Sequence, residues 1–218
     1  ADELIKAGRI QVNGETVTEL GVKVTMQDTV LLDDQEIKPQ TLRYILLNKP
    51  KDAVTTMEDT HDRRTVLDLV EGACEERIYP VGRLDRMTTG LLLLTNDGDL
   101  SKRLTHPSHR VKKVYVATLN KEIHPSDVHK LASGIELEDG ETKFDSIHVN
   151  QGRDESLSVI VSLHSGKNRI VRRMFSHLGY RVEKLDRIEF AGIQKGSLTR
   201  GTWRTLSEKE IGFLKMAK

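Results

Sequence analysis

Residues 82–100, GRLDRMTTGLLLLTNDGDL, form the stretch that decides the fold. Its leucine run, residues 91–94, carries no charge and is bounded by Gly90 on one side and by Asn96-Asp97-Gly98 on the other. An apolar run of this length between turn residues is more typical of a fully buried strand than of a helix. A second apolar stub, residues 78–81, precedes it and contains a proline, which predicts a sheet edge or a strand end.

The polar loop between these two apolar segments carries one carboxylate, Asp85, with Arg83 and Arg86 on either side. Loops that are held by a buried strand often present reactive groups in enzymes. A salt-bridged surface turn is the simpler interpretation of the same residues, since structural ion pairs also place carboxylates beside arginines.

A resemblance favours the functional interpretation. The whole stretch GRLDRMTTGLLLLTNDGDL resembles the catalytic motif of RNA pseudouridine synthases, in the small-ribosomal-subunit (RsuA/RluB-like) branch of that family. The resemblance implies that Asp85 is the catalytic aspartate. It also implies that Arg83 fills the gap left in the RNA when the target base leaves its stack.

Composition alone does not indicate a nucleic-acid-binding protein. Of the 218 residues, 31% are charged and the net charge is +1, so an RNA site must come from local clustering. The single cysteine, Cys74, excludes an intramolecular disulfide and is compatible with a reducing cytosol. No apolar run approaches membrane length and no signal peptide is visible, so we expect a cytoplasmic protein without membrane contact.

Residues 1–42 are acidic, with four Lys and Arg residues against eight Asp and Glu residues. A helix end followed by Gly8 leads into a hairpin signal, Asn13-Gly14, between two short alternating segments. The stretch ADELIKAGRIQVNGETV resembles the second half of an S4 RNA-binding domain. We therefore predict a partial S4-like module in residues 1–42, and a small ordered appendage that does not bind RNA is the alternative. Residues 43–218 would then form the catalytic domain.

Three further motifs carry the resemblance through the catalytic domain. YILLNKP, residues 44–50, resembles the opening motif of the synthases, whose lysine, here Lys49, shapes a loop beside the active site. KKVYVATL, residues 112–119, resembles the tyrosine motif and implies that Tyr115 stacks on the target base. SGKNRIVRRMF, residues 165–175, resembles the motif in which a basic residue, here Arg172, pairs with the catalytic aspartate and an aliphatic residue, here Val171, lines the uracil pocket.

Basic residues gather in two clusters near these motifs. Residues 102–113 contain five Lys and Arg residues and no acid, and residues 167–187 contain seven Lys and Arg residues against two acids. A solvated face is the usual meaning of such runs, but their place beside the predicted site favours contacts with phosphates. The residues predicted to bind RNA are Lys49, Arg83, Arg86, Lys112, Lys113, Lys167, Arg169 and Arg173.

Helix signals complete the pattern. Asp99 is a candidate N-cap for a short helix that ends near Leu104, and Ser207 with Glu210 forms a capping box for a final helix. Together the elements predict an α+β fold, with a large, mixed, mostly antiparallel sheet flanked by helices and a small N-terminal S4-like module.

The predicted function is an isomerase (an intramolecular transferase) that converts a specific uridine of bacterial ribosomal RNA, with the large subunit favoured, to pseudouridine. The reaction breaks the N1–C1′ bond and joins C5 to C1′ with no net gain or loss of atoms, so no cofactor is expected. A carboxylate such as Asp85 would act as nucleophile or charge stabiliser, and Arg172 would keep it ionised. None of the eight histidines lies in a ligand pattern, so no metal is expected. We expect the chain to act as a monomer.

Two alternatives differ in class. One is an RNA-binding ribosome-assembly factor on the same fold that has no turnover. The other is a glycoside or nucleoside hydrolase, which would normally need a second carboxylate that the matched motifs lack.

Overall fold

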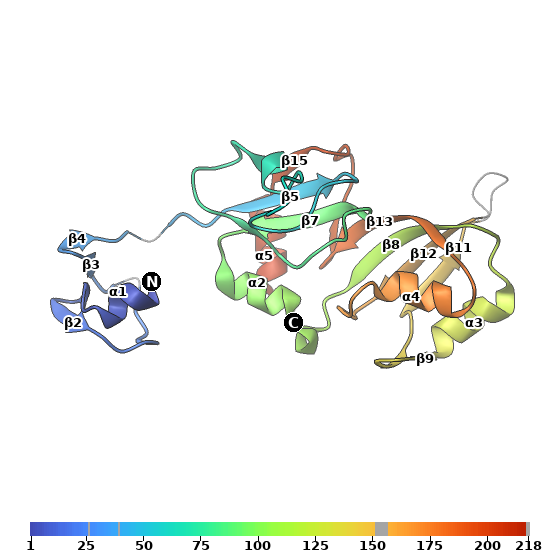
Figure 1. Cartoon of the computed structure of the whole chain (residues 1–218), viewed down its shortest axis with the longest axis horizontal. Coiled ribbons are helices and arrows are strands. Elements are labelled where there is room, and N and C mark those ends of the chain that lie inside the picture. The colour runs from blue at the N-terminus through green and yellow to red at the C-terminus, as the bar shows by residue number, and fades with distance from the viewer. Residues whose placement is uncertain (26, 39, 151–156, 217–218) are drawn as a thin grey trace. The chain divides into compact units, whose positions relative to one another are not determined.

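The computed structural model describes residues 1–25, 27–38, 40–150 and 157–216. The chain divides into two compact units, Ala1–Thr41 and Leu42–Lys218. Figure 1 shows the helices and strands of each unit. No helix in the described ranges is both long enough and apolar enough to cross a membrane.

The first unit is a small sheet with one short helix, α1 (Asp2–Lys6). Its strands are β1 (Ile10–Val12), β2 (Glu15–Val17), β3 (Val30–Leu32) and β4 (Gln35–Glu36), arranged antiparallel in the order β2-β1-β3-β4. Asn13 and Gly14 both have positive φ values, 53° and 87°, as a two-residue hairpin turn requires. The hairpin predicted at Asn13-Gly14 is therefore confirmed.

The second unit is built on a large sheet that contains nine strands within the described ranges. These strands are β5 (Tyr44–Lys49), β6 (Tyr79–Pro80), β7 (Thr89–Thr95), β8 (Lys113–Leu119), β11 (Ser146–Val149), β12 (Ser158–Leu163), β13 (Val182–Phe190), β14 (Ile193–Gln194) and β15 (Trp203–Thr205). The main path runs β11-β12-β8-β13-β7-β5-β15, and its ladders are antiparallel except for the parallel pair β7–β13. A two-stranded sheet, β9 (Ile135–Leu137) with β10 (Gly140–Thr142), lies apart from it. The α+β fold with a mixed, mostly antiparallel sheet is confirmed.

Strand β7 is buried along its whole length, as predicted from the leucine run. Leu91 and Leu93 pack into one apolar cluster, and Leu92 and Leu94 pack into another, because successive side chains of a strand point to opposite faces of the sheet. Each leucine is at most 1% exposed, and burying such a side chain contributes about 1.5–3 kcal/mol. The strand is therefore a rigid base for the loop that precedes it.

Helices cover the sheet on both faces. They are α2 (Gly98–Thr105), α3 (Pro125–Ser133), α4 (Ile170–His177) and α5 (Glu208–Met216), with 3-10 turns η1 (Asp68–Val70) and η2 (Pro107–His109). Helices α2 and α5 contribute to the apolar cluster of Leu91 and Leu93, whereas α3 and α4 pack on the half of the sheet that contains β8 and β12 (Figure 1).

The helix caps correct one prediction and confirm another. The N-cap of α2 is Asp97 and not Asp99, since the Asp97 carboxylate accepts a hydrogen bond from the Leu100 amide at 2.9 Å. At α5, the Ser207 amide donates to the Glu210 carboxylate at 2.9 Å, and the Glu210 amide donates to Ser207 Oγ at 3.3 Å. This reciprocal pair is the capping box that the sequence predicts.

Gly90 brings two distant parts of the chain into close contact. It lies opposite Arg187 in the parallel pairing of β7 with β13, at φ +106°. A Cβ atom at this position would lie 2.2 Å from the carbonyl oxygen of Arg187, so only glycine fits. The contact aligns the loop before β7 with strands β13 and β8.

Candidate active site

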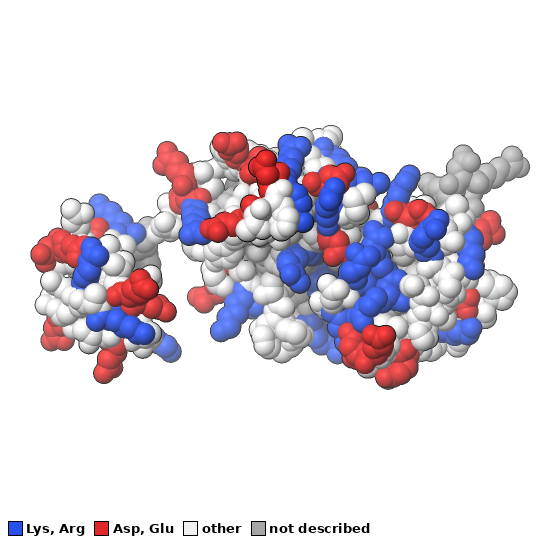
Figure 2. All heavy atoms as spheres, viewed as in Figure 1, with Lys and Arg blue, Asp and Glu red and all other residues white. Residues whose placement is uncertain are grey.

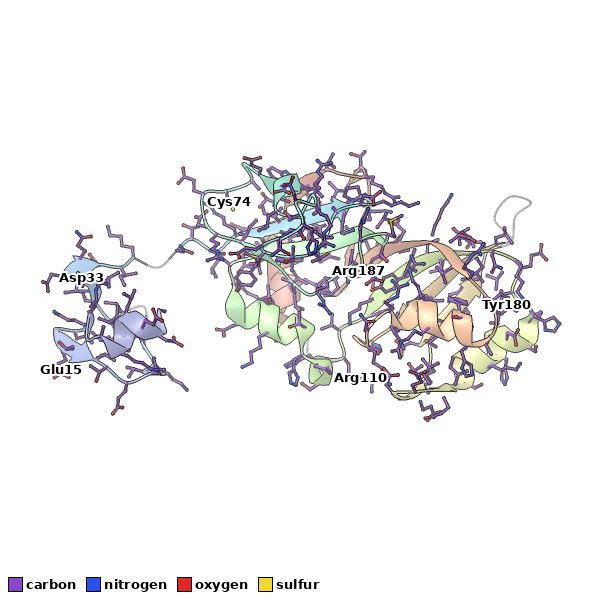
Figure 3. All side chains as sticks on the ribbon, in the orientation of Figure 1. Glu15, Asp33, Cys74, Arg110, Tyr180 and Arg187 are labelled. Atoms are coloured by element: carbon purple, nitrogen blue, oxygen red, sulfur yellow. The ribbon has the colours of Figure 1, made fainter. Side chains whose placement is uncertain are left out.

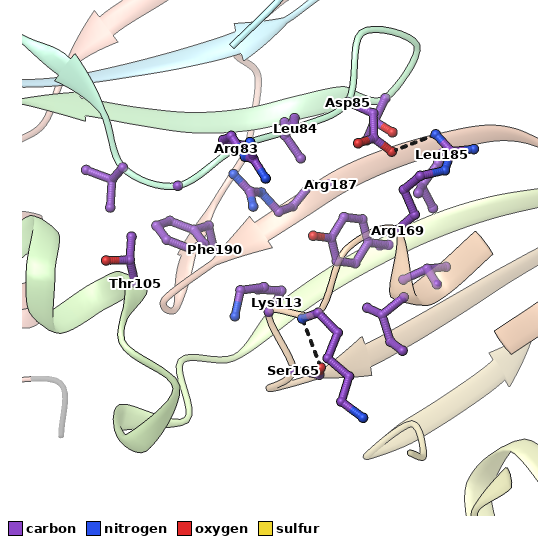
Figure 4. A pocket seen from close by; sticks show the side chains of 18 of the residues that line it. Arg83, Leu84, Asp85, Thr105, Lys113, Ser165, Arg169, Leu185, Arg187 and Phe190 are labelled. Carbon is purple, nitrogen blue, oxygen red and sulfur yellow. Dashed lines mark hydrogen bonds and ion pairs between the residues drawn. The ribbon is translucent and has the colours of Figure 1, made fainter. Parts of the chain in front are cut away.

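A cavity of about 180 Å³ lies among the loop before β7, strands β8 and β13, and the start of α4 (Figure 4). Its volume is several times the ~30 Å³ that one water occupies in the liquid, which leaves room for a planar ring. Seven residues predicted from the sequence line it: Arg83, Asp85, Lys113, Tyr115, Lys167, Arg169 and Val171. Residues from three separate motifs thus meet at one cavity.

Asp85 is at one end of the cavity, on the loop between β6 and β7. Its carboxylate Oδ2 lies 3.2 Å from Nη1 of Arg169, and the side chains are 35% and 52% exposed respectively. Arg169 is the N-cap of α4 and adopts a left-handed backbone conformation with φ 47°. The ion pair is visible as a dashed line in Figure 4.

The structure differs from the predicted pairing of Asp85 with Arg172. Nη1 of Arg172 instead donates to the carbonyl oxygen of Val182 at 2.6 Å, within a half-buried setting on α4. Burial and repulsion from Arg169 lower the pKa of Arg172, and attraction from Asp85 opposes them. The direct ion pair is made by Arg169, because this residue precedes the helix at a sharp turn.

Tyr115 and Val171 supply the apolar walls. Tyr115 is half-buried on β8 and lies opposite Arg187 of β13, and Val171 is 3% exposed at the start of α4. Leu185 and Phe190 of β13 complete the lining on this side. A ring and aliphatic side chains beside a carboxylate can hold the flat face of a base while its sugar lies near the charge.

Lys49, which the sequence predicts to bind RNA, has a completely buried side chain in this structure. Its ammonium donates to the carbonyl oxygen of Pro50 and to three carbonyl oxygens of the loop before β7, those of Asp85, Arg86 and Thr88, at 2.9–3.2 Å. Burial lowers the pKa of Lys49 to about 8, although Asp85 and Asp52 attract the charge. Lys49 thus fixes the loop that carries Asp85.

A turn beside the loop that carries Asp85 explains the position of the Arg86 side chain. Asp52 adopts a positive φ of 61°, which aspartate tolerates better than most residues. Its amide donates to the Arg86 carbonyl at 3.0 Å, and its carboxylate lies 2.8 Å from Nη2 of Arg86. Both side chains are exposed, so Arg86 lies outside the cavity as part of a surface ion pair.

The other predicted RNA-binding residues differ in how available they are. Arg83 is exposed at the rim, and no ion pair or hydrogen bond of its side chain is seen among the described residues. Lys167 and Arg173 both pair with Asp139, at 3.6 Å and 2.8 Å. Lys112 lies outside the cavity, 3.9 Å from Glu189.

Lys and Arg side chains gather on the face of the second unit that Figure 2 shows. A second depression, next to α4, is lined by Arg169, Arg172, Arg173 and Arg181. These residues belong to the basic cluster predicted within residues 167–187, and their charge would attract phosphates.

Sequence reasoning missed Arg187, which is 2% exposed and lines the cavity. Its Nε donates to the Leu91 carbonyl at 2.7 Å, and its guanidinium carbon lies 4.6 Å from the centre of the Phe190 ring. The sequence offered one signal, Gly90, but only the β7–β13 pairing shows that this glycine faces Arg187. Among the described residues, no group of three or more His, Cys, Asp and Glu side chains could hold a metal ion.

The fold and the cavity are those of an RNA-modifying enzyme. The chain belongs to the RNA pseudouridylate synthase family, whose model matches residues 43–177, and an S4 domain model matches residues 1–30. It is an RNA pseudouridine synthase, an isomerase that carries an S4 domain.

Bacterial relatives match almost the whole chain. An uncharacterized RNA pseudouridine synthase of Aquifex aeolicus is 40% identical over 216 residues, which cover 98% of this chain and 86% of the relative. The ribosomal large subunit pseudouridine synthase B of Bacillus subtilis is 40% identical over 215 residues, covering 97% and 87%. A crystal structure of a pseudouridylate synthase is 28% identical and superposes with a TM-score of 0.71, over 98% of this chain and 91% of the other.

Proposed function

We propose that this synthase converts one specific uridine of large-subunit ribosomal RNA to pseudouridine, with Asp85 as nucleophile or charge stabiliser. The observation that carries the proposal is that Asp85 and Tyr115, from distant motifs, line one cavity with a cationic rim. The name of the Bacillus subtilis relative, a ribosomal large subunit synthase at 40% identity, supports the choice of RNA.

The reaction breaks the N1–C1′ bond, turns the detached uracil and joins its C5 to C1′, after which C5 loses its hydrogen as a proton and N1 takes up a proton. Asp85 stabilises or attacks the centre that becomes electron-poor when the glycosidic bond breaks. The adjacent guanidinium of Arg169 holds the carboxylate in position, and the charge of Arg172 adds to its field. The atoms balance without a cofactor.

Base recognition falls to the walls of the cavity. We assign stacking on the uracil to Tyr115 and lateral contact to Val171, since the two side chains line the same space as Asp85. Arg83 is free at the rim to fill the gap that the flipped nucleotide leaves. Lys167, Arg169 and Arg173 would contact phosphates of the RNA. The enzyme would act as a monomer in the cytoplasm, where the ribosomal RNA is.

The residues present argue against the two alternatives. Asp85 is the only acid among the described residues that line the cavity, whereas glycoside hydrolysis normally uses two carboxylates. A non-catalytic assembly factor would not need an aspartate whose backbone carbonyl is held by Lys49 and whose carboxylate is held by Arg169.

Mapping pseudouridine in ribosomal RNA tests the substrate. RNA from a strain that lacks the gene is compared by mass spectrometry with RNA from the same strain complemented by the wild-type gene or by Asp85→Asn. We expect one large-subunit pseudouridine to disappear and to return only with the wild type. Loss of a small-subunit or transfer-RNA site instead would refute the choice of substrate and leave the activity intact.

A further inference from the structure

Two cationic side chains, Lys113 and Arg187, line the cavity and make no ion pair with an acid of the described chain. Figure 4 shows both beside Phe190, on the other side of the view from the Asp85–Arg169 pair. Arg187 is 2% exposed, and its Nη2 has no hydrogen-bond partner within the described residues. A buried guanidinium with an unsatisfied N–H donor destabilises the fold unless a ligand accepts a hydrogen bond from it.

Lys113 is half-buried and is held by backbone oxygens only. Its Nζ donates to the carbonyl oxygens of Val111 at 2.8 Å and His164 at 3.2 Å. Burial and repulsion from Arg187 lower the pKa of Lys113 to about 8, and the more weakly acting Asp145 opposes them. The Asp145 carboxylate lies 2.7 Å from Nδ1 of His164.

Strand pairing keeps the two cations together. In the β8–β13 ladder Lys113 lies opposite Phe190, and Tyr115 lies opposite Arg187. The Phe190 ring contacts the Arg187 guanidinium and fixes its orientation. The two strands thus hold both charges next to Tyr115, the residue proposed to stack on the uracil.

Two neighbouring positive charges without a counterion favour an anion over a neutral group. Uracil carbonyls would accept hydrogen bonds but would leave both charges uncompensated, whereas a phosphodiester compensates one and bridges both. We propose that Lys113 and Arg187 form a phosphate subsite, which binds the phosphodiester next to the target nucleotide. The inference rests on the proposed function and adds a second anchor within the same cavity.

Proton uptake gives the subsite a measurable signature. Burial and Arg187 lower the pKa of Lys113 in the free chain, and an anion within about 4–6 Å stabilises the charged form. Binding of phosphodiester-containing ligands should therefore weaken as pH rises above 8. A lysine that only packs against the cavity wall would not respond to the ligand.

The test is a pH titration of lysine side chains by NMR, with the full chain labelled with 13C at lysine Cε. Lys113→Met removes one resonance and so assigns it, and the adjacent exposed Lys112 serves as an internal reference. The probes are the dinucleotide uridylyl-3′,5′-uridine, uridine alone and inorganic phosphate, each compared with sodium chloride at equal ionic strength. We expect the dinucleotide to raise the pKa of Lys113 by about one pH unit, while uridine leaves it unchanged.

Two results would overturn the subsite: no response of Lys113 to the dinucleotide, whether or not inorganic phosphate has an effect, or a response to uridine equal to the response to the dinucleotide. Arg187→Met should raise the pKa of Lys113 in the free chain and reduce the effect of the dinucleotide. If that variant does not fold, the wild-type titration still decides. Because no turnover is needed, a chain that forms pseudouridine but fails this titration loses only the subsite.

Discussion

Nη1 of Arg169 lies 3.2 Å from Oδ2 of Asp85, and the pair joins the loop before β7 to the start of α4, 84 residues later in the chain. Both side chains are partly exposed, so the pair contributes little to stability, about 1 kcal/mol or less. Its value is positional, because it fixes the direction in which the carboxylate faces the cavity.

Arg169→Ala should therefore reduce catalysis more than stability. We expect kcat/KM on ribosomal RNA to fall about tenfold or more, with the free energy of unfolding changed by no more than about 1 kcal/mol. Arg172→Ala should behave differently, since it leaves the half-buried Val182 carbonyl without its donor and costs about 1–3 kcal/mol. Urea denaturation and initial rates separate the two variants. Full activity in Arg169→Ala would show that the ion pair has no part in turnover.

Lys49→Met should detach the catalytic loop from the sheet. The three loop carbonyls and that of Pro50 would lose their common donor, at a cost of about 1–3 kcal/mol, and turnover should fall because Asp85 is no longer held.

The pH dependence of stability tests the same residue. The pKa of Lys49 is about 8 in the folded chain and is ordinarily 10.5, so between these values the unfolded chain binds more protons. This lysine should therefore make the folded state more stable as pH rises from 8 to 10.5. Urea denaturation at several pH values should show a smaller rise in Lys49→Met than in wild type. An equal rise of the free energy of unfolding with pH in both proteins would contradict the lowered pKa of Lys49.

Gly90→Ala tests the close contact of β7 with β13. The new Cβ would meet the Arg187 backbone at 2.2 Å, so we expect a loss of about 3 kcal/mol or more, or failure to fold. Gly72→Ala is the matched control, because Gly72 also has a positive φ, +77°, but has open space around it. That control should cost only about 1–2 kcal/mol. Similar unfolding midpoints for the two variants would exclude a steric role for Gly90.

Local patterns were sufficient to predict the elements around the site. The leucine run gave the buried strand β7, Asn13-Gly14 gave a hairpin, and Ser207 with Glu210 gave the cap of α5, because each signal lies within a few residues of its consequence. The α2 cap was placed two residues too late, since Asp97 and Asp99 are equivalent as sequence signals.

Long-range geometry accounts for what the sequence did not reveal. Lysine is ordinarily a surface residue, and only the position of Lys49 on β5, beside the loop that carries Asp85, shows that it is buried. The left-handed backbone conformation of Arg169 decides which arginine reaches Asp85. Helical spacing in the sequence does not predict this conformation. Arg187 enters the cavity through the pairing of β13 with β7, which joins strands that are far apart in the chain.

The most direct test of the central claim is tritium release from ribosomal RNA that carries uridine labelled at C5, because formation of the C5–C1′ bond expels that hydrogen. Wild type and Asp85→Asn are compared on the same RNA, with binding measured separately. We expect wild type to release label with EDTA present and no cofactor added, and Asp85→Asn to bind within a few-fold but release it orders of magnitude more slowly. Release by Asp85→Asn at the wild-type rate would contradict the account of this active site.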